Sequence, residues 1–413
     1  MKQTLFNKNF ISLWTWDLFT LLVVKLRGII IPLVILNATS SSQTVASVSL
    51  VQQVVIFSLM IPVGAWVERR RKIKTAVIFR LLYGVGLFLL AVVLTVGGLN
   101  ITLMTGLLVF VSVCGMVAST AFNAMIPQVA GRSKLLQANT YLEGAESIAT
   151  LIGPAIGGYL LGSVGVSTAL FIASGVSIIS TICAMNLTFD DHHSHCQATA
   201  TKKASFWRHS LEGFNYLRKY PQQVINTLIY CVLEFSTVYI EMSLLFYTTV
   251  NLNLSENSVG IIFSSAGIGT IVSLLMVNFF KHINWVKALM ILLAGATLGT
   301  AIMIMSDNHY MIGLGMAIFD GSLAMGYIIQ STIHQGLSPD NILAQAGSAY
   351  YLIGGLFSMI GTAAAGLLPD LFNGHIALMI GSVVLGIIAC AMYLFRDYGQ
   401  PVDEIDLIVL EEK

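Results

Sequence analysis

Charged residues are scarce in this chain. Asp, Glu, Lys and Arg make up 10% of its 413 residues, whereas hydrophobic residues make up 56%. A typical soluble domain has about 25% charged residues, and so few polar side chains cannot cover a water-soluble fold of this length. The composition therefore predicts an integral membrane protein. A net charge of +1 gives no general basic surface for nucleic acid.

Patterns typical of disulfides, metals and enzymes are also missing. The five cysteines are scattered and form no CxxC pair, so we expect neither a disulfide framework nor a metal site. His192, His193, His195 and Cys196 cluster in a hydrophilic loop, which does not impose the convergent geometry that zinc needs. No P-loop, HExxH or GxSxG signature occurs, so we expect no enzyme and no cofactor.

Long apolar runs are what the sequence does contain. A spanning helix needs roughly 20 mostly apolar residues. Twelve such runs fall near 10–36, 45–67, 75–97, 101–126, 136–161, 167–187, 222–248, 257–280, 285–305, 308–333, 345–368 and 374–395. Strands of a membrane β-barrel would be shorter and alternating. The predicted fold class is therefore an all-α membrane protein with twelve transmembrane helices, the first of which is a retained helix and not a signal peptide.

The basic residues predict how the chain is oriented. Of 21 Lys and Arg residues, three (Lys25, Arg27 and Arg80) lie within predicted helices, and the other 18 fall in segments that share one side of the membrane. Cytoplasmic loops retain cations during insertion. We therefore expect both termini to be cytoplasmic.

A hydrophilic break divides the twelve runs into two sets of six. We predict an N-terminal six-helix bundle at 1–188, a cytoplasmic linker at 189–221, a C-terminal six-helix bundle at 222–396 and an acidic cytoplasmic tail at 397–413. Apolar residues recur with helical spacing at 205–217. This pattern predicts an amphipathic helix that lies along the inner membrane surface or packs against the cytoplasmic helix ends.

The two halves show a weak internal repeat at an offset of 208 residues. The sequence LLQA at 135–138 matches LAQA at 343–346, and further matches join 152–153 to 360–361 and Gly158 to Gly366. Several matches at one offset indicate a duplicated six-helix unit. Such a duplication is typical of transporters that bind substrate between pseudo-symmetric halves.

Two local motifs resemble those of the major facilitator superfamily, and within it the macrolide-efflux-like group of drug and metabolite exporters. The sequence GAWVERRRK at 64–72 looks like the loop motif G-x-x-x-D-R-x-x-R/K, and GPAIGG at 153–158 is similar to the glycine-proline motif of the fifth helix of exporters. The resemblance covers nearly the whole chain through its six-plus-six layout. It implies a fold of two pseudo-symmetric six-helix bundles in a bacterial plasma membrane.

The loop motif implies a gate. Gly64 would allow another helix to come close, and Glu68, in place of the usual Asp, would meet the positive end of the eleventh helix. Arg69 would pair with this acid, and Lys72 completes the motif. The alternative is a charge cluster that only orients the chain.

The second motif implies a bend in the fifth helix. Pro154 removes one helical hydrogen bond, and Gly153, Gly157 and Gly158 permit tight packing. In related exporters this motif is associated with sealing and bending between conformations. A kinked packing seam without that role is the alternative.

Ionisable residues inside the predicted spans are the candidate substrate- and proton-binding groups, because charges at that depth are costly. They lie on the first, seventh and tenth helices, which line the central cavity in the family that the chain resembles. The six residues are Asp17, Lys25, Arg27, Glu234, Glu241 and Asp320. Our hypothesis is that a base of the first helix pairs with an acid of the seventh, while another carboxylate binds a proton. A set of structural ion pairs is the alternative.

Other polar residues receive simpler interpretations. We expect Glu143 and Glu146 to be solvated or paired with bases of the preceding loop, and Arg80 to extend to the cytoplasmic headgroups. Gln52 would bind substrate or a neighbouring helix. Aromatic and methionine side chains would give an adaptable cavity; the candidates are Phe19, Tyr239, Met242, Phe246 and Met325, each with packing as the alternative.

These observations together predict a secondary transporter. The expected activity is proton-coupled antiport that exports macrolide-like or multidrug-like amphiphiles by alternating access. The expected partners are a small-molecule substrate, protons and membrane lipids, with no nucleic acid, and the expected state is a monomer. Export of a native metabolite, siderophore or lipid-like molecule is an alternative. A non-transporting membrane receptor or scaffold is another.

Overall fold

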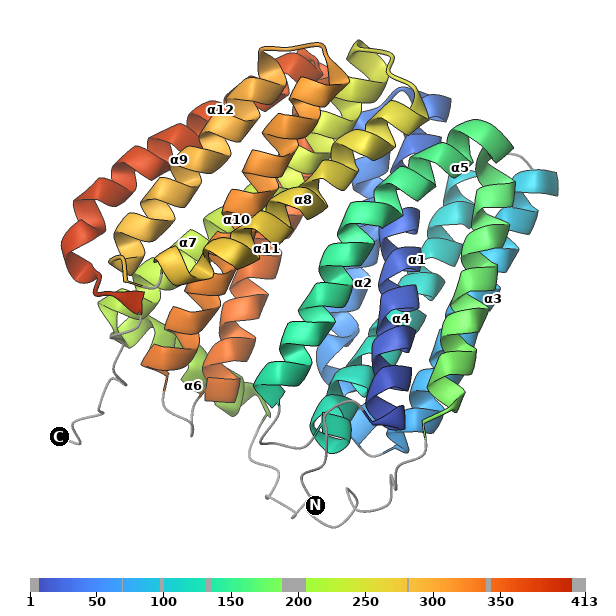
Figure 1. The fold of residues 1–413 in the computed structure, drawn as a ribbon, viewed down its shortest axis with the longest axis horizontal. Coiled ribbons are helices and arrows are strands. Elements are labelled where there is room, and N and C mark those ends of the chain that lie inside the picture. Colours follow the sequence, from blue (N-terminus) through green and yellow to red (C-terminus); the bar gives the residue numbers. More distant parts are fainter. Residues whose placement is uncertain are drawn as a thin grey trace. The chain divides into compact units, whose positions relative to one another are not determined.

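The computed structural model shows an almost entirely helical chain (Figure 1). It describes residues 7–68, 70–96, 100–130, 135–187, 206–280, 282–338 and 343–402. In these residues the only extended pairing is a single bridge between Asn284 and Pro401. Eleven of the described helices are long and apolar enough to cross a membrane.

The chain divides into two compact units. Unit 1 comprises Met1–Ser40, Ser47–Ala200 and Ser255–Ser264, and unit 2 comprises Ser41–Ala46, Thr201–Leu254 and Ser265–Lys413. The first helices of the chain are α1 (Lys8–Thr39), α2 (Ser42–Glu68), α3 (Lys72–Val96), α4 (Ile101–Ala130) and α5 (Leu135–Met185). They are followed by α6 (Phe206–Lys219), α7 (Pro221–Phe246), α8 (Glu256–Phe280), α9 (Trp285–Ile304), α10 (His309–Leu337), α11 (Leu343–Phe372) and α12 (Gly374–Ala391). Short π and 3-10 helices, η3 (Tyr247–Asn251) and η4 (Met392–Tyr398), extend α7 and α12.

Helix α5 explains why eleven long helices satisfy a prediction of twelve spans. It is 51 residues long and contains one non-helical residue, Gly165, with φ +79° and ψ 170°. Positive φ favours glycine because a Cβ would be strained there. The break separates the predicted runs 136–161 and 167–187. The all-α, twelve-span prediction is therefore confirmed, with the fifth and sixth spans joined without a loop.

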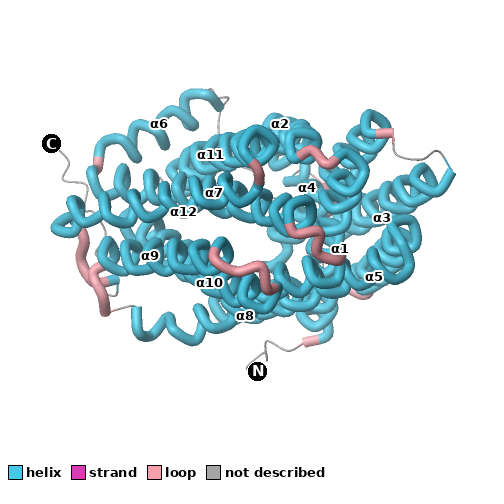
Figure 2. Tube along the Cα trace, turned by 90° about the horizontal axis from the view of Figure 1, so that it is seen from above, coloured by secondary structure: helices cyan, strands magenta, loops and turns pink. Residues whose placement is uncertain are grey.

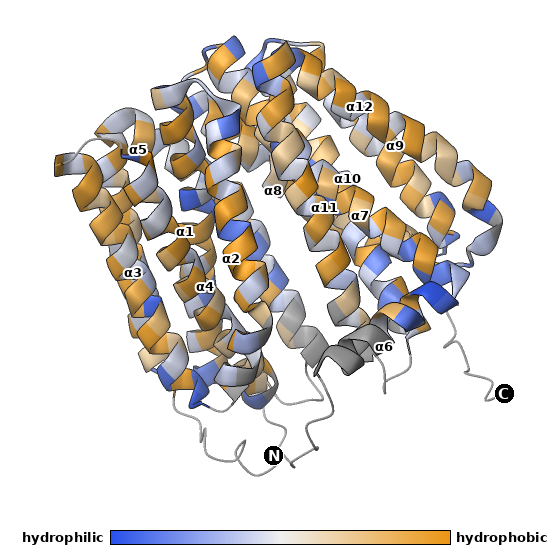
Figure 3. Ribbon diagram, turned by 180° about the vertical axis from the view of Figure 1, so that it is seen from behind, coloured by the Kyte–Doolittle hydropathy of each residue, from blue (hydrophilic) through white to orange (hydrophobic). Residues whose placement is uncertain are grey.

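The helices form because their sequences are apolar over most of their length. Figure 3 shows hydrophobic residues along most of α9 and α12, with hydrophilic residues gathered near helix ends. In unit 1 the interior contains the buried side chains of Leu13, Trp16 and Met125, and the ring of Trp16 meets Phe122 edge-on with centroids 4.9 Å apart. This packing fixes α1 beside α4 at the end of unit 1 where α1 begins.

Unit 2 is a helical bundle in which α7 lies beside α10 (Figure 2). Buried amides join these two helices. The side chain of Asn226 donates to the backbone oxygen of Gln330 over 3.2 Å, and the side chain of Gln330 donates to the backbone oxygen of Asn226 over 3.0 Å. One turn earlier on α7, Gln223 donates to Ser338 over 2.9 Å. These polar groups are buried and hydrogen-bonded, so they fix the register of the two helices.

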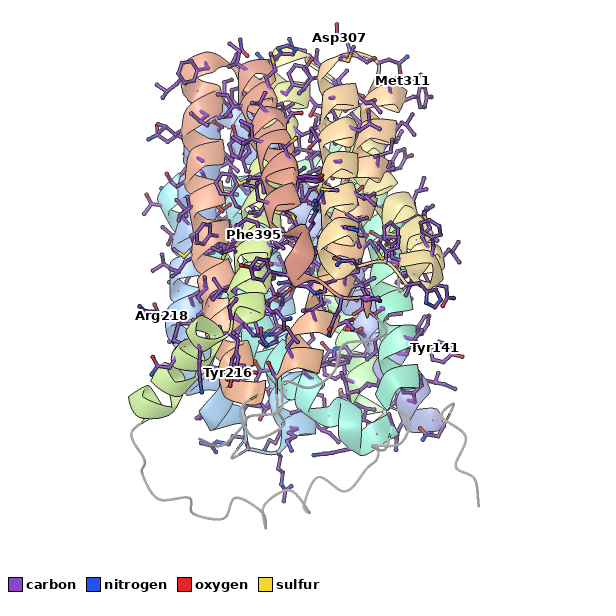
Figure 4. The ribbon with its side chains drawn as sticks, turned by 90° about the vertical axis from the view of Figure 1, so that its left-hand side faces the viewer. Tyr141, Tyr216, Arg218, Asp307, Met311 and Phe395 are labelled. Carbon is purple, nitrogen blue, oxygen red and sulfur yellow. The ribbon has the colours of Figure 1, made fainter. Side chains whose placement is uncertain are left out.

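The amphipathic segment of the linker forms α6, which packs against the helix ends. Tyr216 and Leu217 are buried, and the Tyr216 hydroxyl donates to the Leu337 carbonyl at the end of α10 over 2.6 Å. Figure 4 shows Tyr216 on the side of α6 that faces the bundle, whereas Arg218 points away. Burial raises the pKa of the Tyr216 phenol above its ordinary value. The predicted boundaries of linker and tail remain predictions, because 188–205 and 403–413 lie outside the described residues.

The internal repeat coincides with helix starts. Leu135 is the first residue of α5, and Leu343, which lies 208 residues later, is the first residue of α11. The matched sequence segments therefore begin corresponding long helices, one in each unit.

Candidate functional site

A buried arginine lies at the centre of the polar groups of unit 1. Arg80 on α3 is only 1% exposed, and its guanidinium carbon lies 4.5 Å from the ring centroid of Tyr83. It makes one long hydrogen bond, 3.5 Å to the carbonyl of Thr20, and its Nε has no partner. The expectation that Arg80 extends to the headgroups is therefore wrong. The face of Tyr83 and the electrostatic attraction of Asp17 favour the interior position.

Arg27 approaches the same tyrosine. Its guanidinium carbon lies 5.8 Å from the Tyr83 centroid, and Nη1 donates to the Ser112 hydroxyl over 3.4 Å. Ser112 in turn donates to the side-chain oxygen of Gln52 over 2.8 Å. Gln52 of α2 is therefore hydrogen-bonded to a residue of α4. Unlike Arg80, Arg27 is partly exposed. Two cations thus share one aromatic ring within unit 1.

The acids of unit 1 gather where α1 meets α5. Asp17 interacts electrostatically with Glu146 and Glu143 of α5 and with Arg80. Lys25 forms an ion pair with Glu146, with Nζ 3.5 Å from Oε1. Glu146 therefore pairs with a base of α1; the bases of the preceding loop lie outside the described residues. The ion pair between Lys25 and Glu146, at the seam where α1 meets α5, was not predicted from the sequence.

The glycines of the GPAIGG motif create that seam. A Cβ on Gly153 would lie 2.7 Å from the Cβ of Lys25, and one on Gly157 would lie 2.9 Å from a methyl carbon of Ile29. Both contacts are closer than real side chains allow, so α1 can approach α5 only because these residues are glycine. Glu146 precedes Gly153 by two helical turns, which places the Lys25 ammonium beside its carboxylate.

The remainder of the motif packs against the start of α8, which also belongs to unit 1. A Cβ on Gly158 would collide with the carbonyl oxygen of Glu256, and one on Gly260 would lie 2.6 Å from the carbonyl of Pro154. The backbone N–H of Ala155 donates to the Ser264 hydroxyl over 2.7 Å. The motif is therefore a close-packed backbone crossing as well as the site of a proline within α5.

The loop motif after α2 is described only in part. Arg69 and the side chain of Glu68 lie outside the described residues, so the predicted gate remains a prediction. Lys72 begins α3 and is 8% exposed. A Cβ on Gly64 would meet no heavy atom within 4 Å. The close helix approach expected at this glycine remains a prediction.

A different acid occupies a helix start. The carboxylate of Asp370, near the end of α11, accepts hydrogen bonds from the backbone N–H groups of Ser42 over 2.8 Å and Gln43 over 3.0 Å. The Ser41 and Ser42 hydroxyls also donate to it. All of these residues belong to unit 2. An acid at the positive end of α2 satisfies otherwise unpaired N–H groups, and no sequence signal pointed to it.

The main carboxylate of unit 2 is surrounded by tyrosines. The hydroxyls of Tyr230 and Tyr327 interact with the carboxyl group of Glu234 on α7. Tyr327, on α10, also lies 3.1 Å from the hydroxyl of Thr237, and it interacts electrostatically with Glu241. Glu234 and Tyr327 are both partly exposed. An acid held by neutral hydroxyl donors is stabilised without an ion pair.

Stacked rings extend from this carboxylate. Tyr230 stacks on Tyr350 with centroids 4.2 Å apart, and His334 stacks on the same ring at 4.4 Å. Tyr327 and Tyr351 approach Tyr230 edge-on. The sequence analysis did not select these rings, although Tyr230 precedes Glu234 by one helical turn. Among the candidates it did select, Tyr239, Phe246 and Met325 are buried packing residues.

Asp320 lies elsewhere in unit 2. Its Oδ2 accepts a hydrogen bond from Thr270 of α8 over 3.0 Å, at a crossing where the backbones of Gly269 and Gly321 come close. The described residues contain no group of three or more His, Cys, Asp or Glu side chains arranged to hold a metal ion. The His192–Cys196 group lies outside the described residues.

Helices of this length, with ionisable side chains within their spans, are those of a multi-pass membrane protein. A family model described as Major Facilitator Superfamily matches residues 17–362. The chain therefore belongs to the major facilitator superfamily. The macrolide-efflux-like group remains a resemblance.

Solved structures with a similar fold include transporters and homologues of transporters. The chain is similar to a mutant of the nucleoside transporter NupG, with a TM-score of 0.75, 14% identity, and coverage of 94% of this chain and 100% of that one. For a bacterial homologue of the iron transporter ferroportin, the TM-score is 0.68 at 14% identity, with coverage of 94% of this chain and 99% of that one. For a bacterial homologue of the human lysosomal transporter Spinster, the TM-score is 0.68 at 12% identity, with coverage of 94% of this chain and 96% of that one. No curated protein sequence matches the chain.

Proposed function

We propose that the chain is a proton-coupled antiporter that exports small amphiphilic molecules, of the macrolide-like or multidrug-like kind, by alternating access. It would act as a monomer in a bacterial plasma membrane, with protons as the coupling ion. Its membership of a transporter superfamily supports transport, and the GPAIGG sequence at 153–158, which resembles the exporter motif, favours export.

The observation that carries the proposal is the environment of Glu234. This carboxyl lies within a membrane-spanning helix, and the hydroxyls of Tyr230 and Tyr327 interact with it. When Glu234 is ionised, neighbouring hydroxyls that can donate hydrogen bonds offset part of the cost of a charge at that depth. When it is protonated, it is neutral and can donate in its turn. Both protonation states are thus accommodated, as a proton-exchanging residue requires.

A coupled cycle follows from these two states. A proton enters from outside and neutralises Glu234, and the proton leaves to the inside after the conformational change. An exported molecule moves in the opposite direction. Because the acid needs no fixed cationic partner, its charge state can change without breaking an ion pair.

The test is proton flux in proteoliposomes that contain the purified full-length chain and an internal pH-sensitive dye. Erythromycin and ethidium serve as macrolide and cationic drug probes. We expect either probe to dissipate an imposed pH gradient through the wild type, and Glu234→Gln to abolish this flux. Asp307→Asn, which neutralises an exposed acid of the loop before α10, is the matched control and should retain it.

The outcomes separate the competing functions. Drug movement without proton flux would overturn antiport, and full coupling in Glu234→Gln would overturn the role of this acid. If neither probe is transported, export of a native metabolite becomes the better hypothesis. If a broad panel of metabolites also fails to move, the chain is a receptor or scaffold.

A further inference from the structure

We infer that Arg27 and Arg80, held on the ring of Tyr83, form a binding site in unit 1 for the anionic group of the transported molecule, a carboxylate or a phosphate. This inference rests on the proposed transport function and adds a substrate class to it. The transported amphiphiles would then include organic anions or zwitterions as well as the cationic drug probes.

The charges of unit 1 are matched unevenly. Lys25 has an ion-pair partner in Glu146, and buried Arg80 is attracted by Asp17. Among the described residues of unit 1, no carboxylate lies within 4.0 Å of Arg27. Arg80 and Arg27 repel each other. Within unit 1, Arg27 is thus a cation at membrane depth without a matched acid.

The acids of the seam have other partners. Asp17 precedes Arg27 by ten residues on α1, which is about 15 Å along a helix axis, and it attracts Arg80. Glu146 is the ion-pair partner of Lys25, and Glu143 interacts with Asp17 and Glu146. None of these three acids is paired with Arg27.

Two contacts position the Arg27 guanidinium, but they leave most of its N–H groups available to donate hydrogen bonds. Tyr83 lies beneath the guanidinium, and one N–H group reaches Ser112 over a long 3.4 Å. The side-chain oxygen of Gln52 accepts a hydrogen bond from the Ser112 hydroxyl, which orients the Ser112 oxygen to accept a hydrogen bond from Arg27. A guanidinium with free donors in a planar fork matches the two oxygens of a carboxylate or phosphate.

Arg80, which also contacts the Tyr83 ring, contributes its charge. It is almost completely buried, its Nε has no hydrogen-bond partner, and neither has the hydroxyl of Tyr83. Unsatisfied buried donors around a positive centre are costly. Arg27, which is partly exposed, would make the direct contact with an anion, while the charge of Arg80 would strengthen the attraction through a region of low dielectric constant.

Chemical modification of Arg27 tests the site on the detergent-purified full-length chain. Phenylglyoxal labels accessible arginines, and peptide mass spectrometry quantifies the label. We expect benzoate and phenylphosphate to slow the labelling of Arg27 severalfold, and benzyl alcohol and benzylamine to have no effect. Arg218, exposed on α6, is the internal control, whose labelling should not change. Equal protection by benzylamine, or no protection by either anion, would overturn the inference.

A lipid headgroup could supply the same chemistry, so a second arm uses nanodiscs without added anion. If phosphatidylglycerol protects Arg27 relative to phosphatidylcholine while benzoate and phenylphosphate do not, the site binds lipid and the inference fails. The labelling needs no pH gradient. Its failure therefore leaves proton-coupled transport intact, and a failure of transport leaves the anion site intact.

Thermal unfolding distinguishes a ligand-binding role of Arg27 from a purely structural one. Benzoate and phenylphosphate should raise the Tm of the wild type and of Lys287→Gln, which removes an exposed cation of α9, but not that of Arg27→Gln. Without ligand, Arg27→Gln should unfold at the wild-type temperature or above, because it removes an unmatched charge. A clearly lower Tm would mean that Arg27 holds the fold together, which would overturn the inference.

Discussion

Lys25 of α1 and Glu146 of α5 form an ion pair, with Nζ 3.5 Å from Oε1. The pair exists because Gly153 lets the backbone of α5 lie against the Cβ of Lys25. Packing and charge pairing therefore depend on the same glycine. The predictions below begin with that dependence.

Gly153→Ala should destabilise the protein. The added methyl would lie 2.7 Å from the Cβ of Lys25, which must push α1 from α5 at a cost of about 1 to 3 kcal/mol. Thermal unfolding in detergent measures the change. Gly175→Ala on the same helix is the control, because its Cβ meets nothing within 4 Å, and it should be neutral or slightly stabilising. An unchanged Tm for Gly153→Ala would contradict the seam.

Asp370→Asn should weaken the start of α2. The carboxylate accepts hydrogen bonds from the N–H groups of Ser42 and Gln43, and its charge favours the positive helix end. Loss of an acid of this kind costs about 1 to 2 kcal/mol, which would appear as a lower Tm. Asp307→Asn should cost less, because Asp307 accepts one bond, at 3.2 Å from Tyr247. Equal effects of the two variants would count against the capping role.

Tyr327→Phe should slow proton-coupled transport without changing the fold. It removes one hydroxyl donor from Glu234, and a hydrogen bond to a charged group contributes about 1.5 to 3 kcal/mol. We expect a loss of about tenfold or more in proton flux driven by the drug probes. Tyr310→Phe, at an exposed tyrosine of α10, should retain the wild-type rate. Wild-type flux in Tyr327→Phe would show that the phenol does not support the acid.

Tyr216→Phe should loosen α6. The variant loses the bond from the hydroxyl to the Leu337 carbonyl, which contributes about 1 kcal/mol. Amide hydrogen exchange in α6 should then accelerate about fivefold, while exchange in α9 is unchanged. Equal exchange in the variant and the wild type would mean that Leu217 and its neighbours hold the helix alone.

The docking of α6 should also depend on pH. Burial raises the pKa of the Tyr216 phenol above its ordinary value of 10.0, so the docked form keeps the proton more tightly. The contribution of Tyr216 to docking is therefore fully present below pH 10 and is lost as pH rises through the raised pKa. A spectrophotometric titration should show one tyrosine fewer with a raised pKa in Tyr216→Phe. Identical titrations would contradict this assignment.

The sequence was sufficient for the spans but not for their contacts. Twelve apolar runs follow from composition, because lipid requires long apolar helices. The partner of Lys25 could not be found in this way, because it depends on which face of α5 meets α1. That register is set by Gly153 and Gly157, whose packing partners become visible only in three dimensions.

The candidate site shows the same limit. Asp17, Arg27 and Glu234 were selected because charges are rare within membrane spans. The tyrosines around Glu234 come from α7, α10 and α11, and aromatic residues make up 10% of the whole sequence. Arg80 was misjudged because its distance from the helix start favoured an exposed end, whereas the ring of Tyr83 holds it inside.

The reciprocal amide bonds between Asn226 and Gln330 restrict how unit 2 can move. Each side chain holds the other residue's main chain, so a slip of α10 past α7 by a single residue would break both links together. During a transport cycle these two helices should therefore move together as one rigid element. Sliding of one helix past another is expected instead at contacts that lack two such hydrogen bonds.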